Sequence, residues 1–145
     1  FKLNHMAEQT PNPDSRVMLA DECDALGQRR VKLDWRLNAI DIRTITRAQE
    51  ILSDELRMAG LGHIIIETHQ DQLPPKIHGG WHHMGTTRMH ANPRQGVVTP
   101  DCRLHGTDNL FIAGASTFPT VGYANPVLTT IAVTLRLGDH LKGLL

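Results

Sequence analysis

The stretch that decides how the chain is interpreted is residues 81–89, which reads Trp81-His82-His83-Met84-Gly85-Thr86-Thr87-Arg88-Met89. It lies between residues 78 and 100, a segment with four histidines, several glycines and neither helical nor strand periodicity. Segments without periodicity form loops, and loops carry binding and catalytic residues more often than the elements they connect. We therefore expect the chemistry of this protein to lie here.

The histidines of this segment are the first candidates for that chemistry. Zinc sites need ligands at regular helical or turn spacing, usually with carboxylates or thiolates among them. Adjacent His82 and His83 would point in opposite directions on an extended backbone, so we predict no metal site. Two interpretations remain for a histidine in such a loop. One is a hydrogen-bonded structural role, and the other is a general base, because imidazole titrates near neutral pH.

Upstream of this segment, the pattern predicts an antiparallel pair of strands and one helix after a loop at residues 1–14. Residues 15–20 and 31–37 alternate branched apolar with charged side chains, and a turn at residues 24–27 separates them. A helix follows, with Asp41 as the expected N-cap and Gly60 as the stop. Residues 63–68 include three consecutive isoleucines and predict a buried strand.

Downstream, the sequence predicts one short strand and a terminal helix. The strand covers residues 109–113 and leads into the small residues 114–116. Asn125 is the expected N-cap of the terminal helix, with Pro126 at its first helical position and an end near Leu141. The predicted fold class is therefore α+β, with an antiparallel sheet, a flanking helix, and a further strand and terminal helix.

Composition excludes several classes of partner. The 145 residues are enough for one ordinary domain, so one compact unit is expected. The 15 basic and 15 acidic residues cancel, which argues against nucleic acid and membrane surfaces. Cys23 and Cys102 are far apart and are interpreted as buried or idle thiols. No apolar run of membrane length or signal peptide occurs, so we expect a soluble protein, cytoplasmic or periplasmic, whose compartment is not fixed.

Several further motifs follow residues 81–89 in order, and one precedes them. They are GVV at residues 96–98, DCRLHG at 101–106, NLFIAGAS at 109–116, PT at 119–120, GYANP at 122–126, and PNPDSRV at 11–17. Together they resemble the C-terminal region of the glucose-methanol-choline (GMC) oxidoreductases over nearly the whole chain. The resemblance implies the catalytic part of an FAD-dependent enzyme that oxidises CH–OH groups of an alcohol, sugar or polyol.

The resemblance also implies site residues. The histidine that follows the aromatic residue of the family's string corresponds to His82, and the second member of the catalytic pair corresponds to Asn125. His82 would take the substrate's hydroxyl proton while Asn125, which does not titrate, donates a hydrogen bond to the developing alkoxide. His83 is expected to be noncatalytic. The residues that the resemblance places against FAD are Gly114, Ala115, Asn125, Pro126 and Val127.

The family's domain plan assigns residues 1–90 to a substrate-binding portion and residues 91–145 to a segment that returns to the FAD domain. No Gly-x-Gly-x-x-Gly turn occurs in the sequence, so the FAD-binding N-terminal segment is expected to be absent from this chain. The isolated chain should then be inactive, with the remainder of the flavoprotein and a small alcohol or sugar as its partners. The alternative is a noncatalytic interaction or assembly domain derived from the same scaffold. Substrate, electron acceptor and oligomeric state are not fixed by the sequence.

Overall fold

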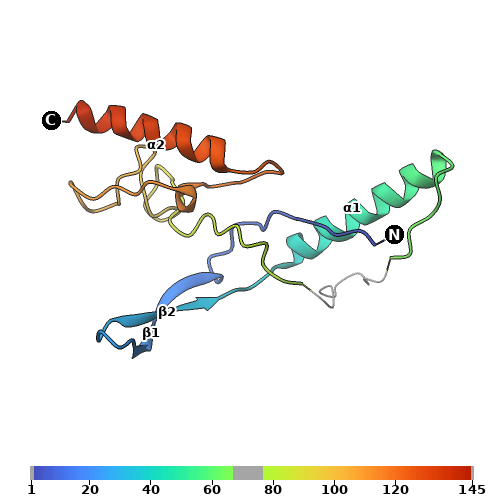
Figure 1. Cartoon of the computed structure of the whole chain (residues 1–145), viewed down its shortest axis with the longest axis horizontal. Coiled ribbons are helices and arrows are strands. Elements are labelled where there is room, and N and C mark those ends of the chain that lie inside the picture. Colours follow the sequence, from blue (N-terminus) through green and yellow to red (C-terminus); the bar gives the residue numbers. More distant parts are fainter. Residues whose placement is uncertain (1, 67–76, 145) are drawn as a thin grey trace. The chain divides into compact units, whose positions relative to one another are not determined.

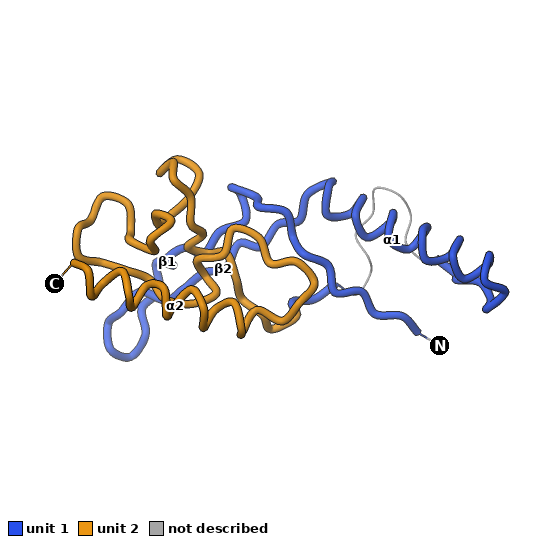
Figure 2. Tube along the Cα trace, turned by 90° about the horizontal axis from the view of Figure 1, so that it is seen from above, with its two compact units in different colours: residues 1–79 blue, residues 80–145 orange. Residues whose placement is uncertain are grey.

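The computed structural model describes residues 2–66 and 77–144, and these form two compact units rather than the one unit expected from chain length. The units are Phe1–Gly79 and Gly80–Leu145, coloured separately in Figure 2. The first holds β1, β2 and α1, and the second holds a short 3-10 helix, η1, and α2 (Figure 1). The predicted α+β class is confirmed. Neither α-helix of the described part is long and apolar enough to cross a bilayer.

The hairpin of the first unit forms where the alternating pattern predicts it. β1 (Arg16–Cys23) pairs antiparallel with β2 (Arg29–Asp34), with Leu19 opposite Val31. The connecting turn is held by Asp24, whose Oδ1 accepts hydrogen bonds from the backbone N–H of residue 26 at 2.8 Å and of residue 28 at 2.9 Å. Gly27 adopts a φ of 76°, which glycine allows without steric cost. The predicted strand pair and its turn are confirmed.

An arginine–carboxylate pair joins the last residue of β2 to the segment that follows it. The Arg36 guanidinium donates to Asp34 through Nε at 3.0 Å and through a terminal nitrogen at 2.8 Å. This hydrogen bond is the main cause that lowers the pKa of the Asp34 carboxyl and raises the pKa of Arg36.

Helix α1 (Ala39–Met58) begins with a capping box rather than with the predicted cap. Asn38 is the N-cap, and its Oδ1 accepts from the N–H of Ile40 at 3.0 Å and of Asp41 at 3.1 Å. Asp41 returns a bond, because its Oδ2 accepts from the Asn38 N–H at 2.9 Å. The prediction of Asp41 as N-cap is thus wrong, since this residue closes the box from the third helical position. Gly60, with a φ of 68°, follows the helix end as predicted.

The strand predicted at residues 63–68 is wrong in its described part. Residues 63–66 are irregular, and the Ile65 side chain is 79% exposed. A strand needs a hydrogen-bonding neighbour, and within the described residues β1 and β2 pair only with each other. Residues 67–68 lie outside the described part of the chain.

The second unit packs around four buried apolar side chains, Val98, Cys102, Phe118 and Leu137. Isolated bridges, rather than strands, surround this core: Val98 bridges to Met89 and to Leu104, and residue 103 bridges to residue 111. The strand predicted at residues 109–113 is therefore reduced to a single bridge. Its neighbour along residues 101–104 winds through a tight turn, which leaves no straight partner to pair with.

Helix α2 (Val127–Lys142) starts one residue later than predicted. Pro126, not Asn125, is its N-cap, and Pro126 contributes no side-chain hydrogen bond. Near its C-terminal end, α2 rests on the loops of its own unit through buried Leu137 and through an edge-on contact of His140 with Phe111, with ring centroids 6.1 Å apart. The predicted end near Leu141 is confirmed.

Candidate functional site

Residues 81–89, which we call the histidine string, lie at the start of the second unit, and their first residues have irregular backbone. Trp81 has a φ of 62°, in the left-handed region that bulky residues rarely enter, and its side chain is 88% exposed. His82 and His83 are both exposed. Bulky residues in this backbone conformation are uncommon and cluster at functional sites, so the conformation of Trp81 indicates a functional role for this turn.

After the histidines, the chain is fixed against a second segment of the unit. The N–H groups of alternate residues donate to three consecutive carbonyls: Gly85 to Ala115 at 3.4 Å, Thr87 to Ser116 at 2.9 Å, and Met89 to Thr117 at 2.7 Å. The Thr87 hydroxyl also donates to the Ser116 hydroxyl at 2.7 Å. We call residues 85–89 together with residues 115–117 the Thr87–Ser116 junction. It places the end of the histidine string beside the predicted flavin-contact residues.

The turn that enters this junction is open on one side. Gly114 precedes η1 (Ala115–Thr117) with a φ of 134°, and a Cβ added there would meet nothing within 4 Å. The Thr117 hydroxyl donates back to the Gly114 carbonyl at 2.9 Å and is fully buried. Main chain at Gly114 and Ala115 can therefore approach a flat ligand closely without a side chain intervening.

The start of α2 provides a second polar surface in this unit. No side chain caps its first turn, and no acidic residue lies there. The first intrahelical bond joins the Thr130 N–H to the Pro126 carbonyl at 2.8 Å, so the N–H groups of residues 127–129 remain available to a ligand. Together with the helix dipole, they amount to about half a positive charge. An anion, or a group that becomes anionic, would be stabilised here.

The structure does not join the predicted catalytic pair directly. His82 and Asn125 belong to the same unit and are both exposed, and no hydrogen bond links them in the described chain. What the structure brings together is residues 85–89 with residues 115–117. The contact of Thr87 with Ser116 carries no signal in the sequence, because the two residues are 29 positions apart and no local spacing rule connects them.

Arg88 has a structural part in this region. Its Nε donates to the Gln95 carbonyl at 2.8 Å. Its own carbonyl accepts from the Val97 N–H at 2.8 Å. These bonds close a loop over residues 88–97. Among residues 2–66 and 77–144, no three His, Cys, Asp or Glu side chains come together as a metal site would require.

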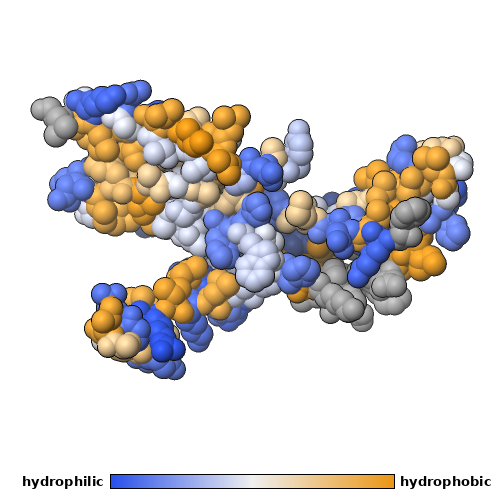
Figure 3. Space-filling view, viewed as in Figure 1, coloured by the Kyte–Doolittle hydropathy of each residue, from blue (hydrophilic) through white to orange (hydrophobic). Residues whose placement is uncertain are grey.

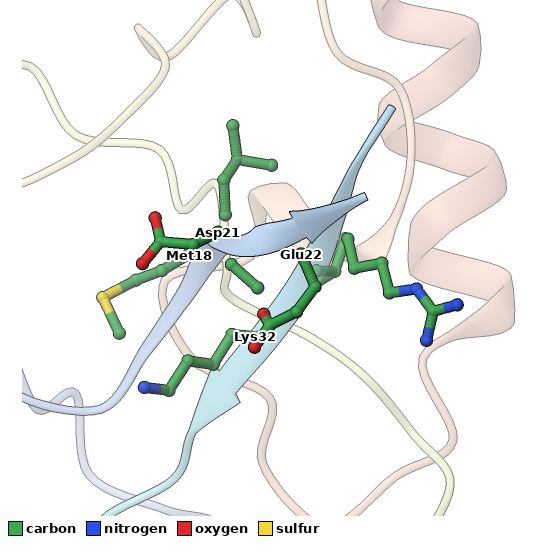
Figure 4. A pocket seen from close by; sticks show the side chains of 8 residues that line it. Met18, Asp21, Glu22 and Lys32 are labelled. Carbon is green, nitrogen blue, oxygen red and sulfur yellow. The ribbon is translucent and has the colours of Figure 1, made fainter. Parts of the chain in front are cut away.

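A hollow of about 630 Å³ lies on the hairpin of the first unit (Figure 4). Its walls carry both acidic and basic side chains, and neither predicted catalytic residue contributes to them. The lining residues are Met18, Leu19, Ala20, Asp21, Glu22, Arg30, Val31 and Lys32. An open hollow on a two-stranded ribbon has no convergent polar groups that would fix the orientation of a small ligand.

Comparison with known proteins decides the family. A family model described as GMC oxidoreductase matches residues 11–134, which include most of both units, the Thr87–Ser116 junction and the start of α2. The chain belongs to the GMC oxidoreductase family. The resemblance found in the sequence motifs is thereby confirmed.

Individual GMC relatives are similar over most of this chain. It is 29% identical to 2-methyl-1,2-propanediol dehydrogenase of Mycolicibacterium austroafricanum, over 84% of the chain and 21% of that protein. It is 30% identical to C-glycoside 3-oxidase of Microbacterium trichothecenolyticum, over 87% of the chain and 24% of the relative. The fructose dehydrogenase large subunit of Gluconobacter japonicus is 29% identical over 94% of the chain and 24% of its own length. The chain thus spans a fifth to a quarter of these GMC relatives.

Proposed function

We propose that this chain is the C-terminal catalytic part of an FAD-dependent oxidoreductase that oxidises CH–OH groups of an alcohol, sugar or polyol. One observation carries the proposal: in a GMC family chain, the Thr87–Ser116 junction sets the histidine string beside the open turn at Gly114. The names of the relatives, which include dehydrogenases and oxidases of a diol and of sugars, support the substrate class.

The residues present fit the ring end of a flavin better than its phosphate end. The open main chain at Gly114 and Ala115 suits a flat group, and the uncapped start of α2 at Pro126 and Val127 suits a negative charge. FAD would supply the hydride acceptor when bound, and its reduction leaves a negative charge on the ring edge. Pyrophosphate binding requires a glycine-rich turn at a helix start, and the sequence has no Gly-x-Gly-x-x-Gly.

The proton chemistry is assigned to two side chains of this chain. Oxidation of an alcohol removes a hydride from carbon and a proton from oxygen, and the proton requires an acceptor. A ring nitrogen of His82 accepts that proton. The Asn125 Nδ2 donates a hydrogen bond to the oxygen as its negative charge develops, and Asn125 cannot itself take the proton. His82 lies in an exposed loop, where a substrate hydroxyl can reach it.

The test uses a polypeptide in which this chain is preceded by a flavin-binding segment. Purified flavoprotein is mixed anaerobically with a panel of alcohols, sugars and polyols, and the loss of oxidised-flavin absorption is followed. We expect bleaching by at least one member of the panel. Reoxidation by oxygen or by an artificial dye then distinguishes an oxidase from a dehydrogenase. A flavoprotein that no CH–OH compound reduces would contradict the proposed function.

A further inference from the structure

Thr87 is attached to Ser116 at two points. Its main-chain N–H donates to the Ser116 carbonyl at 2.9 Å, and its hydroxyl donates to the Ser116 hydroxyl at 2.7 Å. Both side chains are partly buried, so water competes with the hydroxyl pair less than it would on an open surface. Two hydrogen bonds between the same two residues restrict both the distance and the relative orientation of the two segments, whereas a single bond leaves rotation about it free.

The double contact between Thr87 and Ser116 lies close in sequence to both His82 and the turn at Gly114. His82 lies five residues before Thr87, and the open turn at Gly114 lies two residues before Ser116. Gly85, the first residue of the junction, has a φ of 77°. Its neighbours on the histidine side, residues 81–83, are exposed and irregular. The Thr87–Ser116 junction is thus the fixed base from which the loop with His82 extends.

We propose that Thr87 is a positioning residue, whose double hydrogen bond to Ser116 holds the His82 loop in register with the turn at Gly114. The inference rests on the proposed function, because the two segments form one site only if His82 acts on a substrate beside the cofactor. Thr87 itself is not proposed to contact the reacting atoms. Its hydroxyl sets the distance between the proton acceptor and the surface on which the cofactor lies.

A competing explanation is that the hydroxyl pair only stabilises the fold. The three main-chain donors Gly85, Thr87 and Met89 argue for positioning, because together they attach residues 85–89 to residues 115–117 at three successive carbonyls. A purely stabilising bond would change melting temperature and leave the bound geometry unaltered. A positioning bond changes the rate of the chemical step, since an error of about 1 Å in the bound geometry can cost about 100-fold.

The experiment measures anaerobic flavin reduction in the complete flavoprotein for four variants. Thr87→Val removes the hydroxyl at nearly constant shape, Thr87→Ser keeps it, and Ser116→Ala removes its partner. The double variant Thr87→Val/Ser116→Ala completes a cycle. Thr46→Val is the matched control, since it removes a hydroxyl that donates to the Ile42 carbonyl at 3.1 Å within α1.

We expect Thr87→Val to lower the limiting rate of flavin reduction by about 10- to 100-fold, with smaller changes in substrate affinity and flavin content. Thr87→Ser should recover most of the rate, and the control should match the parent protein. The double variant should lose no more than the greater single loss, because both changes remove one bond. A parental rate in Thr87→Val, an equal loss in Thr87→Ser, or losses that multiply would each overturn the inference.

Amide exchange of the same proteins keeps this inference separable from the proposed function. In Thr87→Val, the Met89 N–H, which donates to Thr117, should lose protection while amides of α1 do not change. If the parent flavoprotein oxidises no alcohol, the proposed function fails. Unchanged exchange at Met89 would then count against the register contact independently. If Thr87→Val does not fold, Ser116→Ala supplies both measurements, because its main-chain bond to Thr87 remains.

Discussion

His82 and His83 show how little burial says about the roles of two adjacent residues, because both are exposed. We predict that His82→Ala lowers the rate of hydride transfer in the complete flavoprotein by about 10²- to 10⁴-fold, the usual contribution of a positioned base. His83→Ala should lower it far less. Anaerobic flavin reduction with one good substrate measures both variants, and flavin content serves as the control for folding. Equal losses would contradict the division of roles.

Two glycines of the second unit should respond in opposite directions to alanine. A Cβ at Gly96 would lie 2.6 Å from the His90 Cβ and 2.9 Å from the Arg88 carbonyl oxygen. That carbonyl accepts from the Val97 N–H, so the backbone cannot retreat, and we expect Gly96→Ala to destabilise the fold by about 1–3 kcal/mol.

Gly138 is the matched comparison for Gly96. It lies inside α2, where an added Cβ would meet nothing within 4 Å. Gly138→Ala should stabilise the helix by about 0.8–1.0 kcal/mol, because alanine loses less backbone entropy there. Denaturant unfolding of both variants beside the parent chain gives the two signs. A stabilising Gly96→Ala would show that the loop over residues 88–97 is looser than its contacts imply.

At the scale of elements, α1 depends on its capping box. Asn38→Ala removes the acceptor for two N–H groups of the first turn, and we expect it to cost about 0.5–2 kcal/mol. The amides of Ile40 and Asp41 should exchange faster, while those at the C-terminal end of α1 change little. Asn4→Ala is the control, since Asn4 is exposed in the loop before the hairpin. Unchanged exchange at Ile40 and Asp41 would argue against the box.

The elements that the sequence predicts well are those whose signals are local. The hairpin follows from alternation and a turn at Asp24, and both helices follow from apolar spacing. The capped start of α1 differs from the prediction because Asn38 and Asp41 are both good caps, and only the three-dimensional contacts choose between them. The strands expected at residues 63–68 and 109–113 fail in the described part because a strand depends on a partner that local pattern does not contain.

The candidate site also has features that the sequence locates and features that only the folded chain shows. His82 and Asn125 were located by motif order within the family, and their roles stay predictions. The assignment of residues 1–90 and 91–145 to two functional domains also stays a prediction, whereas the compact units meet at Gly79 and Gly80. The Thr87–Ser116 junction could not be read from spacing, because it joins two irregular segments through hydrogen bonds that only the folded backbone brings together.

At the scale of the whole molecule, apolar surface outweighs apolar core. In the described chain only Val98, Cys102, Phe118 and Leu137 are buried apolar residues. Large apolar side chains remain exposed on both strands and on both helices, and Figure 3 shows such surface over α2, where Leu128 is 80% exposed. Exposed patches of this kind mark interaction surfaces. Under the proposed function, we expect these faces to pack against the flavin-binding part of the enzyme.

The contacts that the chain offers to FAD lead to a prediction about cofactor binding. Within its described residues the chain offers ring-end contacts at Gly114, Ala115 and the start of α2, and the sequence has no Gly-x-Gly-x-x-Gly for the pyrophosphate. We therefore expect the isolated chain, purified and then incubated with FAD, to retain far less than one flavin per chain after gel filtration. Visible absorption measures the ratio, and the complete flavoprotein treated identically is the control. Stoichiometric retention by the isolated chain would contradict this prediction. It would mean that α2 and the turn at Gly114 hold FAD without the pyrophosphate contacts that we assign to a separate flavin-binding segment.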